Sequence, residues 1–282
     1  MNRISSIKIL LARIGRRAVL FLFLGFAVFP LGWIIITSLK PSQEIYSFPL
    51  RYIPSKISIE GYKKLLGFAH FGVYFANSLG ISLLASLGGL IASVLGGFAL
   101  SRLRFSRVMQ GVLLGFYFTQ MVPSFLLMAP LFFSLSKLGL TNNRMVLAII
   151  YGTTTVAFGA IMAKSFFDRI PPSIEEAALI DGCGPITALF QVILPISLPG
   201  LISIFSFSFV NIWNELFLAV MLMSSDTKLT VPVALNSFIS KAGVSWDVMS
   251  AGIVVALMPT MIIFAFGQKY IVAGLTEGGV KE

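Results

Sequence analysis

The chain has 282 residues, of which 57% are hydrophobic and only 11% are charged. A soluble domain carries about 25% charged residues, so the composition excludes an ordinary soluble protein and favours an integral membrane protein. The net charge of +10 does not indicate nucleic-acid binding, because no basic and aromatic motif accompanies it and basic residues commonly flank membrane spans. With one cysteine and one histidine, the chain has no intrachain disulfide, and we expect no metal site.

The apolar residues are gathered into segments long enough to cross a bilayer as helices, for which about 20 residues are needed. In chain order, the six segments are 18–39, 76–100, 108–135, 145–163, 196–214 and 248–268. Pro123 and Pro130 interrupt the third segment, and the fifth continues in apolar residues to Met223. The pattern predicts an all-α integral membrane protein with six transmembrane helices.

The charges near the N-terminus predict the orientation. The first apolar segment is too long for the core of a signal peptide and lacks a cleavage site of small residues, so we expect it to remain as a span. The five basic residues that precede it are Arg3, Lys8, Arg13, Arg16 and Arg17. By the positive-inside rule, residues 1–17 form a cytoplasmic segment, and six crossings return the tail 269–282 to the cytoplasm. The transmembrane core is expected over 76–268.

The second apolar segment carries small residues at a spacing of four. They form two ladders on neighbouring helix faces, one of Ala85, Gly89, Ser93 and Gly97 and the other of Gly88, Ala92 and Gly96. Helices in lipid associate through close backbone contact, which small residues allow. We therefore expect this helix to be packed among others.

The segment between the fourth and fifth apolar stretches contains signals for a short helix of its own. Two adjacent prolines end the preceding helix, Ser173 is a good N-cap, and Glu176 three residues later completes a capping box. Gly182 can form a C-terminal turn, and a second glycine and a proline follow it. These signals predict a helical segment over 173–184 in a cytoplasmic loop.

A helix this short is marginal in water and needs a surface to pack against. One alternative is a helix that lies at the lipid interface, which usually carries Lys or Arg. No basic residue occurs between Pro171 and Pro185, and Ala177, Ala178 and Leu179 provide a small apolar surface. The pattern favours docking into a groove of another protein.

The same loop resembles the EAA loop of binding-protein-dependent ABC importer permeases. The resemblance is carried by Glu176-Ala177-Ala178, by Gly182 and by Leu194-Pro195; Val192 stands where that family usually has isoleucine. The resemblance implies that the short helix is a cytoplasmic coupling helix seated in a cleft of an ATPase subunit. The residues it implies for ATPase coupling are Glu176, Ala177, Ala178, Asp181, Gly182, Leu194 and Pro195.

Other stretches are similar to the carbohydrate-uptake branch of that family. They are Phe75-Ala-Asn77-Ser78, Ala99-Leu-Ser-Arg102-Leu-Arg104-Phe105, Met121-Val-Pro123 and Asn211-Ile-Trp213-Asn214-Glu215. The tail from Tyr270 to Lys281 is similar to the maltose transporter's G-type subunit, with Glu277 where a small residue is usual. The resemblance implies uptake of a sugar or oligosaccharide across the inner membrane of a bacterium or archaeon.

Glu215 is the only acidic residue inside a clearly apolar run. An ionisable residue there marks a substrate pathway or a hydrogen bond between helices or subunits, and both interpretations stay open. Asn211 shares its helix face and Trp213 does not. Trp213 either stacks on a sugar ring or lies at the bilayer interface. The candidate pathway residues are Asn211, Trp213, Asn214, Glu215 and Gln120.

The resemblance also implies the partners. They are two ATP-binding subunits, a second homologous permease that makes a heterodimer, an extracytoplasmic sugar-binding protein and membrane lipid. No cofactor is expected in this chain, because ATP and Mg²⁺ would be bound by the ATPases. The outer loops 40–74 and 224–247 are the implied docking sites for the binding protein.

Two other classes of protein compete with this interpretation. A secondary transporter would need ionisable groups in the membrane for ion coupling and often has internal repeats, whereas this chain has one buried acid and no visible repeat. A membrane metalloprotease needs two histidine ligands, and His70 lies outside the spans. The chain has no phosphate-binding glycine loop, so we expect a transport subunit and not an enzyme.

Overall fold

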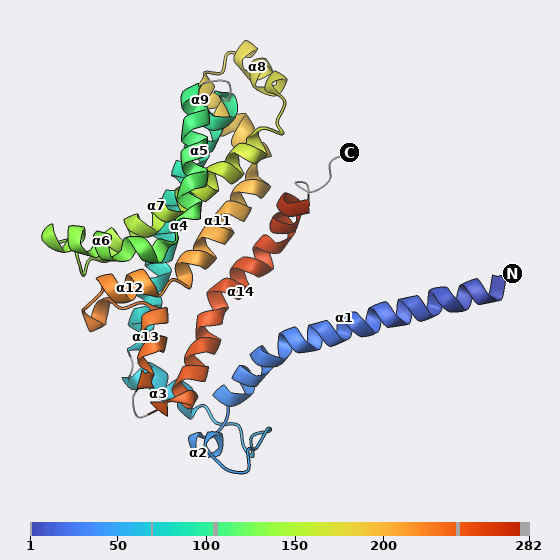
Figure 1. The fold of residues 1–282 in the computed structure, drawn as a ribbon, viewed down its shortest axis with the longest axis vertical. Helices are drawn as coiled ribbons and strands as arrows, with labels where there is room; N and C mark the ends of the chain where they lie inside the picture. Colours follow the sequence, from blue (N-terminus) through green and yellow to red (C-terminus); the bar gives the residue numbers. More distant parts are fainter. Residues whose placement is uncertain (1, 69, 104–106, 241–242, 277–282) are drawn as a thin grey trace. The chain divides into compact units, whose positions relative to one another are not determined.

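The computed structural model describes residues 2–68, 70–103, 107–240 and 243–276 (Figure 1). Of the stretches singled out above, Arg104, Phe105 and the tail beyond Thr276 lie outside this range. The chain forms two compact units. The first comprises Met1–His70 and Ser237–Leu257, and the second comprises Phe71–Asn236 and Met258–Glu282.

Helices make up most of the described chain. In order they are α1 (Asn2–Ser38), α2 (Ser42–Ile45), α3 (Glu60–Phe68), α4 (Phe71–Arg102), α5 (Arg107–Met121), α6 (Ser124–Lys137), α7 (Arg144–Phe167), α8 (Pro172–Ile180), α9 (Pro185–Ala188), the π-helical turn η1 (Leu189–Ile193), α10 (Leu194–Ile196), α11 (Leu198–Trp213), α12 (Phe217–Leu222), the 3-10 turn η2 (Asp226–Lys228), α13 (Val231–Ser237) and α14 (Trp246–Thr276).

The all-α expectation needs one small correction. Strand β1 (Ile239–Ser240) pairs antiparallel with β2 (Gly243–Val244) in a short hairpin before α14. Gly243 has a φ of +125°, which side-chain-bearing residues rarely adopt. The hairpin lies between the fifth and sixth apolar segments, and the pattern of apolar residues did not predict it.

Four helices are long and apolar enough to cross a membrane. They cover Arg13–Ser38, Phe71–Arg102, Arg144–Phe167 and Trp246–Tyr270. Two further pairs qualify only if each bent pair is one span, which gives up to six: α5 with α6, bent by 96°, and Pro185–Ile196 with α11, bent by 79°. The described chain is therefore a helical membrane protein with four to six candidate spans.

The bends fall at prolines. Pro123 occupies the N-cap of α6, and Pro199 lies in the first turn of α11. Proline lacks the backbone N–H that a continuing helix needs, but it suits a first turn, where that N–H has no partner. The third apolar segment is thus bent and the fifth begins at a bend, whereas Pro130 is accommodated inside α6.

The second unit is built around α4, α7 and α11, which pack side by side (Figure 1). A Cβ added at Gly97 of α4 would lie 2.6 Å from the Ala163 Cβ and 2.8 Å from the Ala160 carbonyl oxygen of α7. A Cβ added at Gly89 would lie 3.0 Å from the Gly152 carbonyl oxygen. The ladder that contains these two glycines therefore packs against α7, as predicted.

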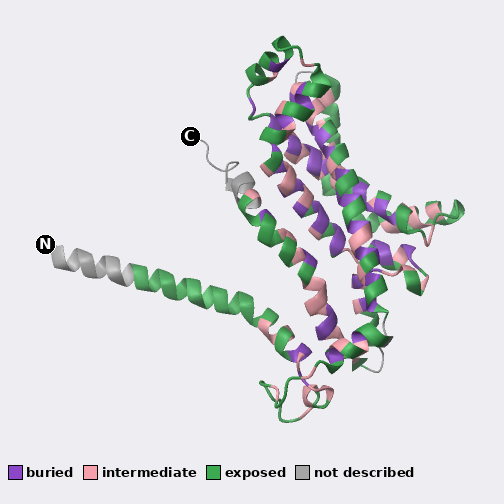
Figure 2. Cartoon of the chain, turned by 180° about the vertical axis from the view of Figure 1, so that it is seen from behind, coloured by how far each residue is buried: buried purple, intermediate pink, exposed green. Residues whose placement is uncertain are grey.

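The other ladder behaves differently. A Cβ at Gly88 would meet nothing within 4 Å, and Gly88 and Ala92 are exposed. Figure 2 shows the same division along α4, where buried and exposed residues alternate with the helical turn. Among the described residues this second ladder is covered only at its end, where Gly96 is half-buried and an added Cβ would lie 3.6 Å from the Ala160 Cβ.

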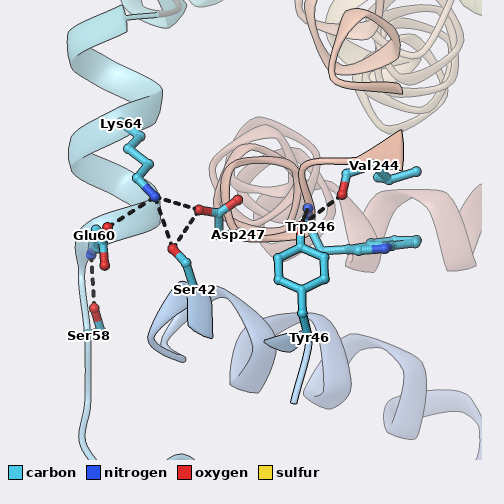
Figure 3. A network of polar contacts seen from close by, with 8 residues as sticks. All are labelled: Ser42, Tyr46, Ser58, Glu60, Lys64, Val244, Trp246 and Asp247. Carbon is cyan, nitrogen blue, oxygen red and sulfur yellow. Dashed lines mark hydrogen bonds and ion pairs between the residues drawn. The ribbon is translucent and has the colours of Figure 1, made fainter. Parts of the chain in front are cut away.

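The first unit contains a polar cluster, drawn in Figure 3, that joins α2, α3 and the start of α14. The Asp247 carboxylate is buried; it accepts from Ser42 Oγ at 2.7 Å and pairs with Lys64 Nζ at 2.9 Å. Lys64 also pairs with Glu60 at 3.0 Å. Hydrogen bonds to Asp247 and then to Glu60 raise the pKa of the Lys64 ammonium above its usual range.

Candidate functional site

Helix α8 begins one residue earlier than predicted and without the predicted cap. Its first residue is Pro172 and its N-cap is Pro171, with no capping hydrogen bond from a side chain. The expected capping box of Ser173 and Glu176 is therefore wrong. The fixed φ of proline is pre-organised for the first helical position, and Pro172 takes that position ahead of Ser173.

The end of α8 follows the sequence more closely. Gly182 has a φ of +88°, and its N–H donates to the Leu179 carbonyl at 3.1 Å. The Cys183 N–H donates to the Ala178 carbonyl at 3.0 Å, which completes a Schellman motif. The helix therefore ends at Ile180, and 181–184 form a turn before α9.

Most of the surface of α8 is exposed in this chain. Ala178 is buried, whereas Glu176, Ala177, Asp181 and Gly182 are exposed. The exposed fraction of Ile180 reaches 85%, so apolar surface at this helix has no cover from the described chain. Beyond the turn, Leu194 is half-buried in a core cluster with Phe167 and Ile193, and Pro195 is exposed.

The first turn of α8 also holds a contact that sequence reasoning missed. Glu175 Oε2 lies 2.6 Å from Arg102 Nε at the end of α4. Two adjacent acidic residues therefore have different surroundings, since Glu176 is exposed and Glu175 is largely shielded. The spacing of 73 residues between the partners leaves no local sequence signal for this pair.

Glu215 lies at a break between two helices. Helix α11 ends at Trp213 and α12 begins at Phe217, so the fifth apolar run does not continue as one helix to Met223. The Glu215 carboxylate accepts from the Leu218 N–H at 3.0 Å and from the Tyr151 hydroxyl of α7. A carboxylate that accepts the free N–H groups of a first turn starts a new helix, which explains the break.

Glu215 also faces a cavity of about 470 Å³ in the second unit. Its polar lining comes from α5, α6, α7, α11 and the break after α11: Gln120, Ser124, Tyr151, Thr154, Thr155, Asn211 and Glu215. Apolar residues, among them Phe158 and Phe207, complete the wall. Among the described residues, the lining offers hydroxyl, amide and carboxylate groups and no basic side chain, a set suited to hydrogen bonding with a neutral polar molecule.

Three of the five candidate pathway residues, Gln120, Asn211 and Glu215, line this cavity. Trp213 is only 2% exposed and packs between Phe209, stacked at 5.9 Å between ring centroids, and Phe75 at 5.4 Å. Asn214 is exposed, and its amide donates to the Val210 carbonyl at 2.8 Å. The structure does not bring Trp213 or Asn214 to the cavity.

In the part of the chain that the structure describes, no three His, Cys, Asp or Glu side chains form a group that could hold a metal ion. Helices with an apolar surface, a polar cavity between them and an exposed short helix on a loop define a class, that of helical membrane transport subunits.

Comparison with known proteins gives the family. The model of the binding-protein-dependent transport system inner membrane component matches residues 88–277, and the chain belongs to this family. The inner membrane ABC transporter permease protein YcjP of Escherichia coli K12 is 36% identical over 96% of this chain and 97% of its own length. The diacetylchitobiose uptake system permease protein DasC of Streptomyces coelicolor is 32% identical over 92% of this chain and 94% of its own.

Solved structures agree with the family. A chain of a bacterial ABC transporter involved in the import of the acidic polysaccharide alginate superposes with a TM-score of 0.81. It is 26% identical, and the match covers 96% of this chain and 98% of that chain. This protein is therefore an inner-membrane ABC transporter permease, a transport subunit and not an enzyme.

Proposed function

We propose that this chain imports a sugar or oligosaccharide, driven by ATPase subunits that act on α8. The observation that carries the proposal is α8 itself, a short helix with the sequence Glu176-Ala177-Ala178 and a Schellman turn at Gly182 whose surface is largely uncovered. A nine-residue helix is marginal alone, so an uncovered one needs a partner surface. A groove on an ATPase subunit supplies that surface.

The cargo is proposed from the relatives and the cavity together. DasC is named for diacetylchitobiose uptake, and another relative is the trehalose/maltose transport system permease protein MalG of Thermococcus litoralis, at 32% identity. The cavity lining of hydroxyl, amide and carboxylate groups can donate to and accept from sugar hydroxyls. Gln120, Asn211 and Glu215 are the residues of this chain proposed to meet the cargo.

The proposed assembly contains two ATP-binding subunits, a second homologous permease and an extracytoplasmic sugar-binding protein. The two permeases form a heterodimer, and ATP and Mg²⁺ bind to the ATPases alone. Both bent helix pairs cross the membrane, which gives six spans with both termini in the cytoplasm. The binding protein docks on the outer loops 40–74 and 224–247.

In the proposed cycle, ATP binding closes the two ATPases and draws their coupling helices together. The helices that line the cavity then change from an inward-facing to an outward-facing arrangement. The docked binding protein releases its sugar into the cavity. ATP hydrolysis separates the coupling helices, and the sugar passes to the cytoplasm.

The first test is purification of the tagged chain from its native membrane in mild detergent, with its partners identified by mass spectrometry. Recovery of an ATPase and a second multi-span subunit is the expected result. Recovery of the chain alone, with uptake driven by an ion gradient, would overturn the proposal in favour of a secondary transporter.

A variant locates the contact. Glu176→Lys should leave the chain in the membrane but abolish recovery of the ATPase, because it reverses a charge on an exposed face of α8. Glu176→Gln keeps the shape and removes only the charge, so we expect it to weaken recovery less. Loss of the Glu176→Lys chain from the membrane would mean that Glu176 serves folding and not docking.

A further inference from the structure

The side chains of Glu175 and Arg102 form an ion pair between α8 and the end of α4. The distance from Arg102 Nε to Glu175 Oε2 is 2.6 Å. The side chains are 19% and 17% exposed, so water screens the pair less than an ordinary surface ion pair. A shielded charge that loses its partner is strongly unfavourable, so the two groups are held together.

The same guanidinium also holds the end of α7. Arg102 Nη1 donates to the Phe167 carbonyl at 3.2 Å and to Ser101 Oγ at 3.1 Å. Ser101 Oγ in turn donates to Asp168 Oδ1 at 2.6 Å. The planar fork of an arginine can hold acceptors in fixed directions, which a lysine cannot do. One side chain thus joins α4, α7 and α8.

The most extensive contacts of α8 in the described chain are with α9 and η1, which follow it in sequence. Among the ion pairs of the described residues, the one with Arg102 is the only one that reaches α8. Helices α4 and α7 are packed tightly against each other through Gly89 and Gly97. A displacement of α8 that acts on Arg102 therefore acts on a rigid pair of helices.

We propose that Arg102 and Glu175 form the link through which movement of α8 is passed to α4 and α7. The inference rests on the proposed role of α8 as the coupling helix. In this scheme Glu176 meets the ATPase, and Glu175, its neighbour in the chain, meets the membrane helices. Both Arg102 and Glu175 are positioning residues, because neither touches the cargo or ATP.

The experiment uses the complete complex, purified with its ATPases and reconstituted with its binding protein in liposomes. It measures the sugar transported per ATP hydrolysed for the wild type, for Arg102→Gln, for Glu175→Gln and for the double variant. Lys164→Gln is the matched control, because it removes a charge that pairs with Asp168 Oδ2 at the same end of α7 and leaves in place the hydrogen bond from Ser101 to Asp168 Oδ1 and the contacts of Arg102. If Arg102→Gln does not accumulate, Arg102→Lys replaces it, since lysine keeps the charge and loses the fork.

We expect each single variant to keep its ATPases and to hydrolyse ATP, while the sugar transported per ATP falls about fivefold or more. The double variant should lose no more than either single one, because the two residues act as a unit. The control should keep the wild-type ratio. A merely structural role would lower the amount of complex and leave this ratio unchanged.

Two results would overturn the inference in different ways. An assembled complex with an unchanged ratio in the single variants, or with losses that multiply in the double variant, overturns the link alone. A wild-type complex that contains no ATPase overturns the proposed function and the link with it.

Discussion

The carboxylate of Glu215 has a structural role in addition to any contact with cargo. It accepts from the Leu218 N–H and from the hydroxyl of buried Tyr151. Glu215→Ala should lower the unfolding temperature in detergent, since loss of a helix cap costs about 1–2 kcal/mol and Tyr151 also loses its acceptor. Glu215→Gln keeps an oxygen at the same place and should retain most of the stability.

The conservative variant also separates the two roles. If Glu215→Gln unfolds at the wild-type temperature but takes up less sugar at limiting concentration, the charge serves the pathway. Wild-type uptake at limiting sugar would contradict an essential pathway role and leave the cap as the function of this residue.

The sequence marked Glu215 because an acid in an apolar run is unusual. Asn211 lines the same cavity, but α11 ends at Trp213, so the two residues do not share a helix face as expected. The sequence could not predict the hydrogen bond from Tyr151, which lies 64 residues away and contacts Glu215 only through the packing of α7. Trp213 is only two residues from Glu215 in sequence, but its side chain is buried in the core. The type of residue predicted that Glu215 is important, whereas the direction in which each side chain points depends on the tertiary structure.

At the scale of helices, glycine-to-alanine substitutions in the two small-residue ladders of α4 should have opposite effects on stability. Gly97→Ala places a methyl group 2.8 Å from the Ala160 carbonyl and 2.9 Å from the Lys164 nitrogen, so the helices must separate. Overpacking of this kind costs about 1–3 kcal/mol. Gly88→Ala meets nothing within 4 Å and should be neutral or gain up to about 1 kcal/mol from helix propensity.

Thermal unfolding of the purified chain in detergent tests the pair, with each variant serving as the control for the other. A lower transition for Gly97→Ala with an unchanged one for Gly88→Ala is expected. Equal shifts would contradict the close packing of α4 on α7 at Gly97.

The sequence predicted a packed α4 but not which ladder packs, because small residues on neighbouring faces give the same signal on both. It likewise predicted a break in the third apolar segment without its angle. Proline identifies a position where the hydrogen-bond ladder stops, and the 96° between α5 and α6 depends on what each half packs against. Helix α8 was predicted because its signals are local in the sequence. Its first residue, Pro172, was not predicted.

At the scale of the whole chain, the number of crossings decides which loops share a side of the membrane. Phe48 lies before α4, Ile180 lies between α7 and α9, and Ile239 lies before α14; their exposed fractions are 98%, 85% and 53%. A single cysteine at each position, in a Cys183→Ser background, can be tested with a maleimide that does not cross membranes. The Cys183→Ser chain alone is the control and should not react.

If both bent pairs cross, three spans separate positions 48 and 180, and one span separates 180 and 239. Phe48→Cys and Ile239→Cys should then react in spheroplasts, and Ile180→Cys should react only after permeabilisation. This is the proposed arrangement, and it places α8 on the side where ATP is available.

The other arrangements give different patterns. With four spans all three positions share one side, because two crossings separate 48 from 180 and none separates 180 from 239. If only α5 and α6 cross, 180 and 239 share a side without 48; if only the second pair crosses, 48 and 180 share a side without 239. Labelling of Ile180→Cys from outside would therefore remove α8 from the reach of any cytoplasmic ATPase and contradict the coupling mechanism.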